Sequence, residues 1–203
     1  MLKAVKNYLL KAKAQQQFIP AERKKLLLEI ADYIHTKREN NQEINLNFIC
    51  THNSRRRHLG QIWAGVIAHF FKIDGVNTFS GGTEVTAFNP RAVAALQRAG
   101  LLIKQKAESQ NPVYVVKFDE ALNGFECFSK VYDDVVNPKE NFAALMTCSQ
   151  AEAECPLILG AEKRFSLHYE DPKNADDTPE EQQCYDDRSL QIAAELFFVF
   201  NNI

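Results

Sequence analysis

One stretch of the chain constrains its fold more than any other. The apolar run INLNFIC (residues 44–50) leads into a short basic loop, and an apolar segment with helical spacing (57–72) follows the loop directly. The run has the length and composition of a buried strand, and the segment after it carries apolar residues on one face of a helix. Strand, loop and helix in this order indicate an α/β fold built around a parallel sheet.

The remaining segments predict the same class. Further strands are expected at residues 75–83, 113–118, 126–132 and 141–148, and further helices at 20–38, at 90–99 and after the capping-box sequence Thr178-Pro179-Glu180-Glu181. We therefore predict an α/β fold of three layers with a small, mostly parallel central sheet covered on both faces. Sites in such sheets lie at the carboxyl ends of strands, where Cys50, Cys148 and Asp171 are expected.

Length and composition fit one compact domain with an appendage. The chain has 203 residues, of which 45% are hydrophobic, and this is enough to bury a sizeable core. We expect residues 1–43 to form an N-terminal helical extension and residues 44–203 to form the catalytic domain.

Charge and cysteine content exclude several classes of protein. A formal net charge of −2 gives no general case for nucleic-acid binding, and no stretch has the apolar length that spans a bilayer. The N-terminus lacks the pattern of a signal peptide. Five cysteines, an odd number, do not suggest a secreted disulfide framework. We expect a cytoplasmic protein with reduced thiols, without nucleic-acid or membrane partners.

The loop CTHNSRR predicts a site for a tetrahedral oxyanion. Its backbone N–H groups, the N-terminus of the following helix and the planar fork of Arg56 can converge on the oxygens of an anion. The predicted oxyanion-binding residues are Thr51, His52, Asn53, Ser54, Arg55 and Arg56. The dipole and the arginines are expected to lower the pKa of Cys50, giving a thiolate nucleophile. The alternative is a buried strand-end cysteine before a solvated basic turn, because a bare C-x5-R recurs by chance.

The stretch FICTHNSRRRHLGQIWA resembles the phosphate-binding loop of the low-molecular-weight protein tyrosine phosphatase superfamily, and in particular of its thioredoxin-coupled arsenate reductases. FSGGTEVTAFNPRAVAALQRAG (79–100) resembles the segment that follows in these families. The likeness continues through TCSQAEAECP and the Glu-Asp-Pro near residue 171, so it extends from Ile44 to the C-terminal helix. It implies a phosphotyrosine protein phosphatase I-like fold.

The resemblance implies a role for individual residues. Cys50 matches the nucleophile, Arg56 the oxyanion clamp, Asn53 a residue that braces the loop, and Asp171 the acid that protonates a leaving oxygen. On its own, Asp171 would be an ordinary turn aspartate before proline. Three positions depart from the family pattern. His52 stands where the families usually have glycine, and Arg55 stands where the reductases often have cysteine. Arg57 replaces the serine or threonine whose hydroxyl usually supports the thiolate.

A second pair of cysteines, Cys148 and Cys155, follows a predicted strand in TCSQAEAEC. The resemblance implies that Cys148 attacks the arsenic adduct of Cys50, and that Cys155 then resolves the Cys50–Cys148 disulfide for reduction by a thioredoxin-like partner. The alternative is a core cysteine and an incidental loop thiol. Metal binding ranks below both, because no second pair of ligands accompanies the cysteines.

The expected function is thiol-dependent reduction of arsenate, without a metal or other cofactor. The main alternative is hydrolysis of phosphomonoesters, phosphotyrosine above all, through a cysteinyl-phosphate formed on Cys50. A third reading is a non-catalytic module that binds phosphate-like anions. The pair Cys148 and Cys155 separates the first two, and the reactivity of Cys50 separates both from the third.

Overall fold

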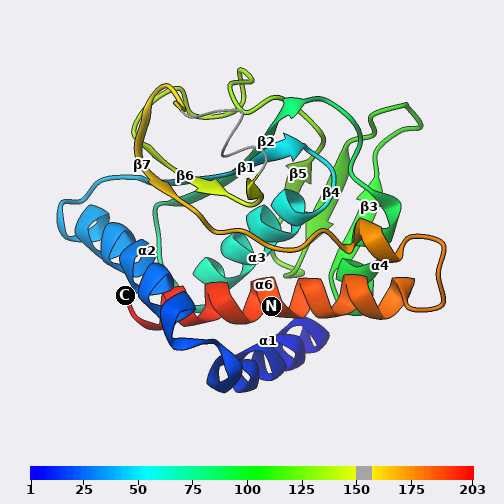
Figure 1. The fold of residues 1–203 in the computed structure, drawn as a ribbon, viewed down its shortest axis with the longest axis horizontal. Helices are drawn as coiled ribbons and strands as arrows, with labels where there is room; N and C mark the ends of the chain where they lie inside the picture. Colours follow the sequence, from blue (N-terminus) through cyan, green and yellow to red (C-terminus); the bar gives the residue numbers. More distant parts are fainter. Residues whose placement is uncertain (150–156) are drawn as a thin grey trace.

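The structure is a computed structural model that describes residues 1–149 and 157–203. Its helices are α1 (Lys3–Gln15), α2 (Ala21–Glu39), α3 (Arg56–Phe70), α4 (Pro90–Arg98) and α6 (Glu181–Asn201), with short 3-10 helices η1 (Gln16–Phe18) and η2 (Pro172–Ala175). Its strands are β1 (Ile44–His52), β2 (Val76–Glu84), β3 (Leu102–Gln105), β4 (Tyr114–Lys117), β5 (Phe125–Cys127), β6 (Phe142–Met146) and β7 (Ala161–Phe165) (Figure 1). Within these ranges, none of the helices is long and apolar enough to cross a bilayer.

A four-stranded parallel sheet with the order β2-β1-β6-β7 forms the centre of the molecule. The predicted α/β class with a parallel central sheet is therefore confirmed. β1 is an inner strand, and its residue Cys50 pairs with Gly82 of β2. Since all four strands run in the same direction, the carboxyl ends of β1 and β6 lie at the same edge of the sheet.

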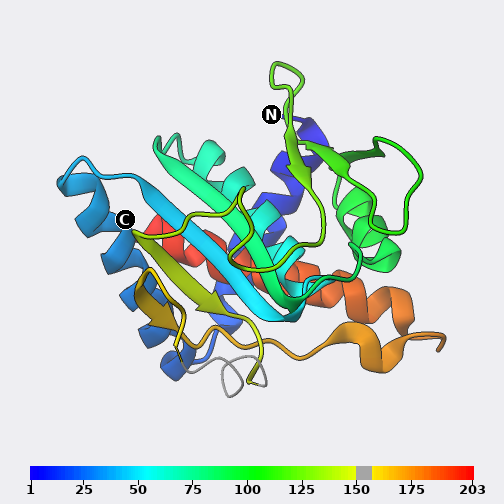
Figure 2. The ribbon, with the colours of Figure 1, turned by 90° about the horizontal axis from the view of Figure 1, so that it is seen from above.

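Side chains alternate between the two faces of this sheet, and each face is buried differently. Phe48 of β1 belongs to the large core with the helices, which Figure 1 shows gathered on one side of the sheet. Ile49 of β1 and Met146 of β6 face the other way and form a smaller cluster. There Tyr132 packs against them, from the segment between β5 and β6 that crosses the strands in Figure 2.

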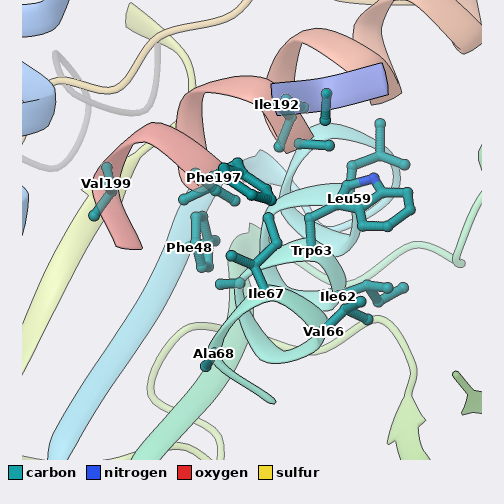
Figure 3. Close-up of a cluster of buried hydrophobic side chains, with 14 of the residues drawn as sticks. Phe48, Leu59, Ile62, Trp63, Val66, Ile67, Ala68, Ile192, Phe197 and Val199 are labelled. Carbon is teal, nitrogen blue, oxygen red and sulfur yellow. The ribbon is translucent and has the colours of Figure 1, made fainter. Parts of the chain in front are cut away.

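The large core places α3, and with it the loop after β1. Trp63 of α3 is fully buried, and its indole N–H donates to Ser189 of α6. Figure 3 shows the α3 side chains meeting Phe48 and Phe197. Burial of a side chain such as Phe48 contributes roughly 1.5–3 kcal/mol relative to leaving it in water. Gly60 allows this close approach, since a Cβ there would lie 2.4 Å from the Phe48 ring.

The N-terminal helices pack on the same core. Val5 and Leu9 of α1 and Ile30 of α2 are buried in it, and both helices contact α6. Tyr8 stacks on Trp63 with 4.8 Å between the ring centroids. The division into an extension (1–43) and a catalytic domain (44–203) remains a prediction about how the chain is organised.

The strand predicted at residues 126–132 is wrong beyond Cys127. β5 ends there and belongs to a separate antiparallel sheet, β3-β4-β5. The residues that follow bond elsewhere: the Ser129 N–H donates to Asn111, and the Lys130 carbonyl accepts from Gly82 of β2. Asn111 and Gly82 thus form hydrogen bonds with the backbone groups that a longer β5 would need for pairing.

The predicted capping box of the last helix is also wrong. α6 begins at Glu181 with Glu180 as its N-cap, and no side chain caps it. The Thr178 hydroxyl donates to the Ala175 carbonyl instead of accepting from the helix. Asp177 has a left-handed backbone (φ 63°), which turns the chain sharply before the helix starts.

Candidate active site

Cys50 lies near the carboxyl end of β1 and is 4% exposed. The strand continues for two residues beyond it, because His52 pairs with Glu84 and the Thr83 hydroxyl donates to the Thr51 carbonyl. α3 starts at Arg56, so the connection between strand and helix is only residues 53–55. The backbone at Thr51 and His52 therefore follows the sheet, where the sequence predicted a loop.

A cavity of about 560 Å³ opens at this edge of the sheet. The described residues that line it are Cys50, Thr51, Ser54, Arg55, Arg56, Arg57, Thr86, Cys148, Ser149, Asp171, Lys173 and Asn174. Four predicted catalytic residues, Cys50, Arg56, Cys148 and Asp171, are thus brought together from the ends of β1 and β6, the start of α3 and the start of η2. The fifth, Cys155, lies outside the described residues.

Arg56 spans the cavity between the cysteine and the aspartate. Its Nη2 lies 3.6 Å from Cys50 Sγ and donates to Asp171 Oδ2 at 2.6 Å. Its Nη1 donates to the Tyr169 carbonyl at 2.7 Å, which fixes the plane of the guanidinium. Asp171 is held in turn by the Lys173 N–H, which donates to its Oδ1. An oxyanion that entered the cavity would compete with Asp171 for Arg56.

Two loop side chains that are among the predicted oxyanion-binding residues anchor the loop to its surroundings, and for Asn53 this is the bracing role that the resemblance implies. Arg55 lines the cavity, but its guanidinium donates to the Tyr185 hydroxyl at 2.8 Å and to Asp176 at 3.2 Å. Asn53 is buried, and its side-chain amide donates to the Lys130 carbonyl at 3.1 Å. Sequence reasoning did not find Tyr185 or Asp176, because no local pattern relates residues more than a hundred positions apart.

Cys148 lies two residues beyond β6, directly beside Cys50. The two sulfur atoms are 2.8 Å apart, which is longer than the roughly 2.05 Å of a disulfide bond. The Thr51 hydroxyl lies 3.9 Å from Cys148 Sγ. Thiols at this separation can form a disulfide with little movement of the sheet, since their strands are neighbours.

The predicted low pKa of Cys50 is wrong for this arrangement. The hydrogen bond with Cys148 and then burial raise the pKa of Cys50, whereas the charges of Arg57 and Arg56 lower it. Burial disfavours the thiolate, and a neighbouring thiol that accepts the proton of Cys50 favours the neutral form. The arginines act in the predicted direction, but the contact with Cys148 outweighs them.

Removing Cys148 is therefore expected to make Cys50 more acidic. In Cys148→Ala the largest contribution that raises the pKa of Cys50 is lost. The pH at which Cys50 is half deprotonated should therefore fall by about one unit or more. The measurement is the rate of iodoacetamide labelling of the Cys50 peptide as a function of pH. Cys184→Ala, which changes a half-buried thiol on α6, is the control. An unchanged midpoint in Cys148→Ala would contradict the proposed origin of the shift.

Comparison with known proteins finds relatives of low sequence identity. No family model matches it. It is 27% identical over 141 residues to an arsenate reductase of Bacillus licheniformis, a match that covers 68% of this chain and 81% of that protein. It is 26% identical over 125 residues to an arsenate reductase of Staphylococcus aureus strain Newman, covering 62% and 76%.

The fold likeness is to a phosphatase. The structure matches a low-molecular-weight phosphotyrosine phosphatase from Vibrio cholerae O395 with a TM-score of 0.52 and 13% identity, over 78% of this chain and 95% of the other. The fold is therefore that of a low-molecular-weight phosphotyrosine phosphatase, with the cavity at the carboxyl edge of its sheet. The chain is thus similar in sequence to arsenate reductases and in fold to a low-molecular-weight phosphotyrosine phosphatase.

Proposed function

We propose that this enzyme reduces arsenate with thiols. The observation that carries the proposal is the 2.8 Å separation of Cys50 Sγ and Cys148 Sγ at the edge of the sheet. Hydrolysis of a phosphomonoester needs one cysteine, because water discharges the intermediate. Reduction needs a second thiol within reach of the first, and Cys148 meets that requirement. The similarity to arsenate reductases supports the same substrate.

In the first step, arsenate occupies the cavity and Cys50 acts as the nucleophile. Arg56 exchanges its contact with Asp171 for the oxygens of the anion, and the N-terminus of α3 adds its positive end. The Cys50 thiolate forms a bond to arsenic, and one arsenate oxygen leaves as water. Asp171 is placed beside Arg56 to supply a proton to that oxygen.

In the second step, Cys148 provides the reducing electrons. Its thiolate attacks Cys50 Sγ, so the S–S bond forms as the S–As bond breaks. The electron pair of the broken bond stays on arsenic, which is thereby reduced from As(V) to As(III) and leaves as arsenite. The two thiols are oxidised to a Cys50–Cys148 disulfide, and the electrons balance.

The third step returns Cys50 to its thiol form. Cys155 attacks Cys148, which releases Cys50 and leaves a Cys148–Cys155 disulfide for a thioredoxin-like dithiol to reduce. The role of Cys155 rests on the sequence and the resemblance alone, because the residue lies outside the described part of the chain.

The lining of the cavity supports a small inorganic anion. The described residues around it are polar or charged apart from the two cysteines, and none of them is aromatic. An aryl ester would gain most from an aromatic or apolar wall that holds its ring. This favours arsenate over phosphotyrosine as the substrate of the same cavity.

The proposal is tested by two assays on one preparation of the wild-type enzyme. With thioredoxin, thioredoxin reductase and NADPH, arsenate should drive repeated NADPH oxidation and release arsenite. With an aryl phosphate under the same conditions, we expect turnover to be much slower. Rapid hydrolysis of the aryl phosphate without any reduction of arsenate would reject the proposal in favour of a phosphatase, and inertness in both assays would favour an anion-binding module.

A further inference from the structure

Arg57, in the first turn of α3, is a buried cation beneath the nucleophile. Its side chain is 1% exposed, and its Nη1 donates to the Cys50 carbonyl at 2.9 Å and to the Gly81 carbonyl. Gly82 leaves room for it, because a Cβ there would lie 2.7 Å from Arg57 Nη1. The guanidinium thus ties the end of β1 to β2 at the wall of the cavity that Arg56 enters.

The hydrogen-bond partners of this guanidinium are backbone carbonyls. In the described part of the chain, no acidic group forms an ion pair with Arg57, and its Nη2 is buried without a hydrogen bond. A buried charge needs a compensating charge or a set of hydrogen bonds. Cys50, Cys148 and Asp171 favour the Arg57 cation when they are negative, whereas Arg56 opposes it. Burial lowers the pKa of Arg57 to about 9, and the guanidinium remains charged at neutral pH.

We propose that Arg57 is a positioning residue whose buried charge stabilises the thiolate of Cys50 from below, while Arg56 binds the oxyanion from the cavity. The inference rests on the proposed function, in which Cys50 is the attacking thiolate. It assigns the two consecutive arginines to different partners, because Arg56 contacts Asp171 and Arg57 contacts the backbone of the nucleophile itself. Of the two, Arg57 lowers the pKa of Cys50 more.

The guanidinium of Arg57 can reach more groups than the hydroxyl that it replaces. A hydroxyl at position 57 could reach one acceptor at most, whereas the guanidinium holds two carbonyls on adjacent strands and still brings its charge close to Cys50. Because the charge is buried, water and salt screen it weakly, so its effect on the thiolate should persist at high ionic strength. A solvated arginine at the rim of the cavity would lose its influence under the same conditions.

The test is the pH profile of Cys50 labelling in variants of Arg57. Arg57→Gln keeps an amide donor but removes the charge, and it should raise the Cys50 midpoint by about one unit or more, both at low salt and in 1 M NaCl, where the Debye length is about 3 Å. Arg57→Lys keeps a cation and should lie between Arg57→Gln and the wild type. Arg55→Gln is the matched control: it removes a charge two residues away, at the N-cap of α3, but one that is held by Tyr185 and Asp176.

A Cys50 midpoint in Arg57→Gln equal to that of the wild type would overturn the proposal. So would equal shifts in Arg57→Gln and Arg55→Gln, because net charge would then explain them, or an Arg57→Lys midpoint no lower than that of Arg57→Gln. Circular dichroism checks the fold, and Arg57→Met, with a similar unbranched side chain, replaces Arg57→Gln if the latter does not fold. Labelling requires no turnover, so failure of the wild type to reduce arsenate would reject the proposed function alone.

Discussion

Cys148→Ser should abolish the reduction of arsenate and leave any hydrolysis of aryl phosphate nearly intact. The serine hydroxyl is close in size to the thiol that lies 2.8 Å from Cys50 Sγ, but it cannot attack Cys50 Sγ to form a disulfide and so cannot supply the electrons. Water still reaches a cysteinyl-phosphate on Cys50, so the phosphatase reaction needs no second thiol. The measurement is arsenite released per enzyme, beside the rate of aryl-phosphate hydrolysis.

Cys155→Ser should stop the reaction one step later. After treatment with arsenate it should accumulate a Cys50–Cys148 disulfide, which Cys148→Ser cannot form. Peptide mapping by mass spectrometry without reductant identifies the linkage, and Cys184→Ser is the control for loss of an unrelated thiol. If the wild-type enzyme forms no Cys148–Cys155 disulfide with arsenate and yet hydrolyses aryl phosphate, the enzyme is a phosphatase.

Arg56→Lys should reduce turnover by about 10²–10³-fold and weaken anion binding, even though the charge is kept. The guanidinium contacts Asp171, the Tyr169 carbonyl and Cys50 Sγ at the same time. A lysine ammonium cannot reproduce this planar arrangement, so the anion would be held by a point charge in a variable position. Turnover with arsenate and protection of Cys50 from iodoacetamide by arsenate measure the two effects.

Arg55→Lys is the matched comparison for Arg56→Lys. Because the hydrogen bonds of Arg55 run to Tyr185 and Asp176, we expect a smaller loss, through a loosened loop. Wild-type activity in Arg56→Lys would mean that Arg55 or Arg57 clamps the anion, and the residue assignment carried over from the family would then be wrong.

The inner strands of the central sheet, β1 and β6, were predictable because they are buried on both faces. The run at residues 44–50 is apolar apart from Asn45 and Asn47, and the structure places it in the middle of a parallel sheet, where one face meets the helices and the other the smaller cluster. Gly60 and the apolar side of α3 fit closely on Phe48, so strand, loop and helix form one packed unit. Local pattern and tertiary packing agree there.

The electrostatics of the site were not predictable from local sequence. The loop alone suggests an acidic thiol, since the helix N-terminus and the arginines are neighbours in sequence. The group that reverses the shift, Cys148, is 98 residues away and is brought close only by the pairing of β1 with β6. In the sequence Arg57 resembles a solvated charge in a basic run, whereas in the structure Gly82 of β2 leaves room for its buried guanidinium.

The predicted boundaries of helices and strands were wrong where groups from distant segments bind the backbone or side chains at the end of the element. β5 stops at Cys127 because Asn111 and Gly82 bond the residues that follow. The start of α6 is set by the turn at Asp177, whose N–H donates to Glu181. Residue spacing predicts which element a local segment can form, but at these two positions hydrogen bonds with other residues set where the element begins or ends.

The stacking of Tyr8 on Trp63 makes the fluorescence of Trp63 a probe of the packing between α1 and α3. Trp63 is the only tryptophan of the chain, and its ring is fully buried with Tyr8 of α1 parallel to it. Its emission therefore depends on whether the N-terminal helix is docked. Since Trp63 also belongs to the helix that begins at Arg56, its fluorescence is expected to report on the docking of α1 from within the element that carries Arg56 and Arg57.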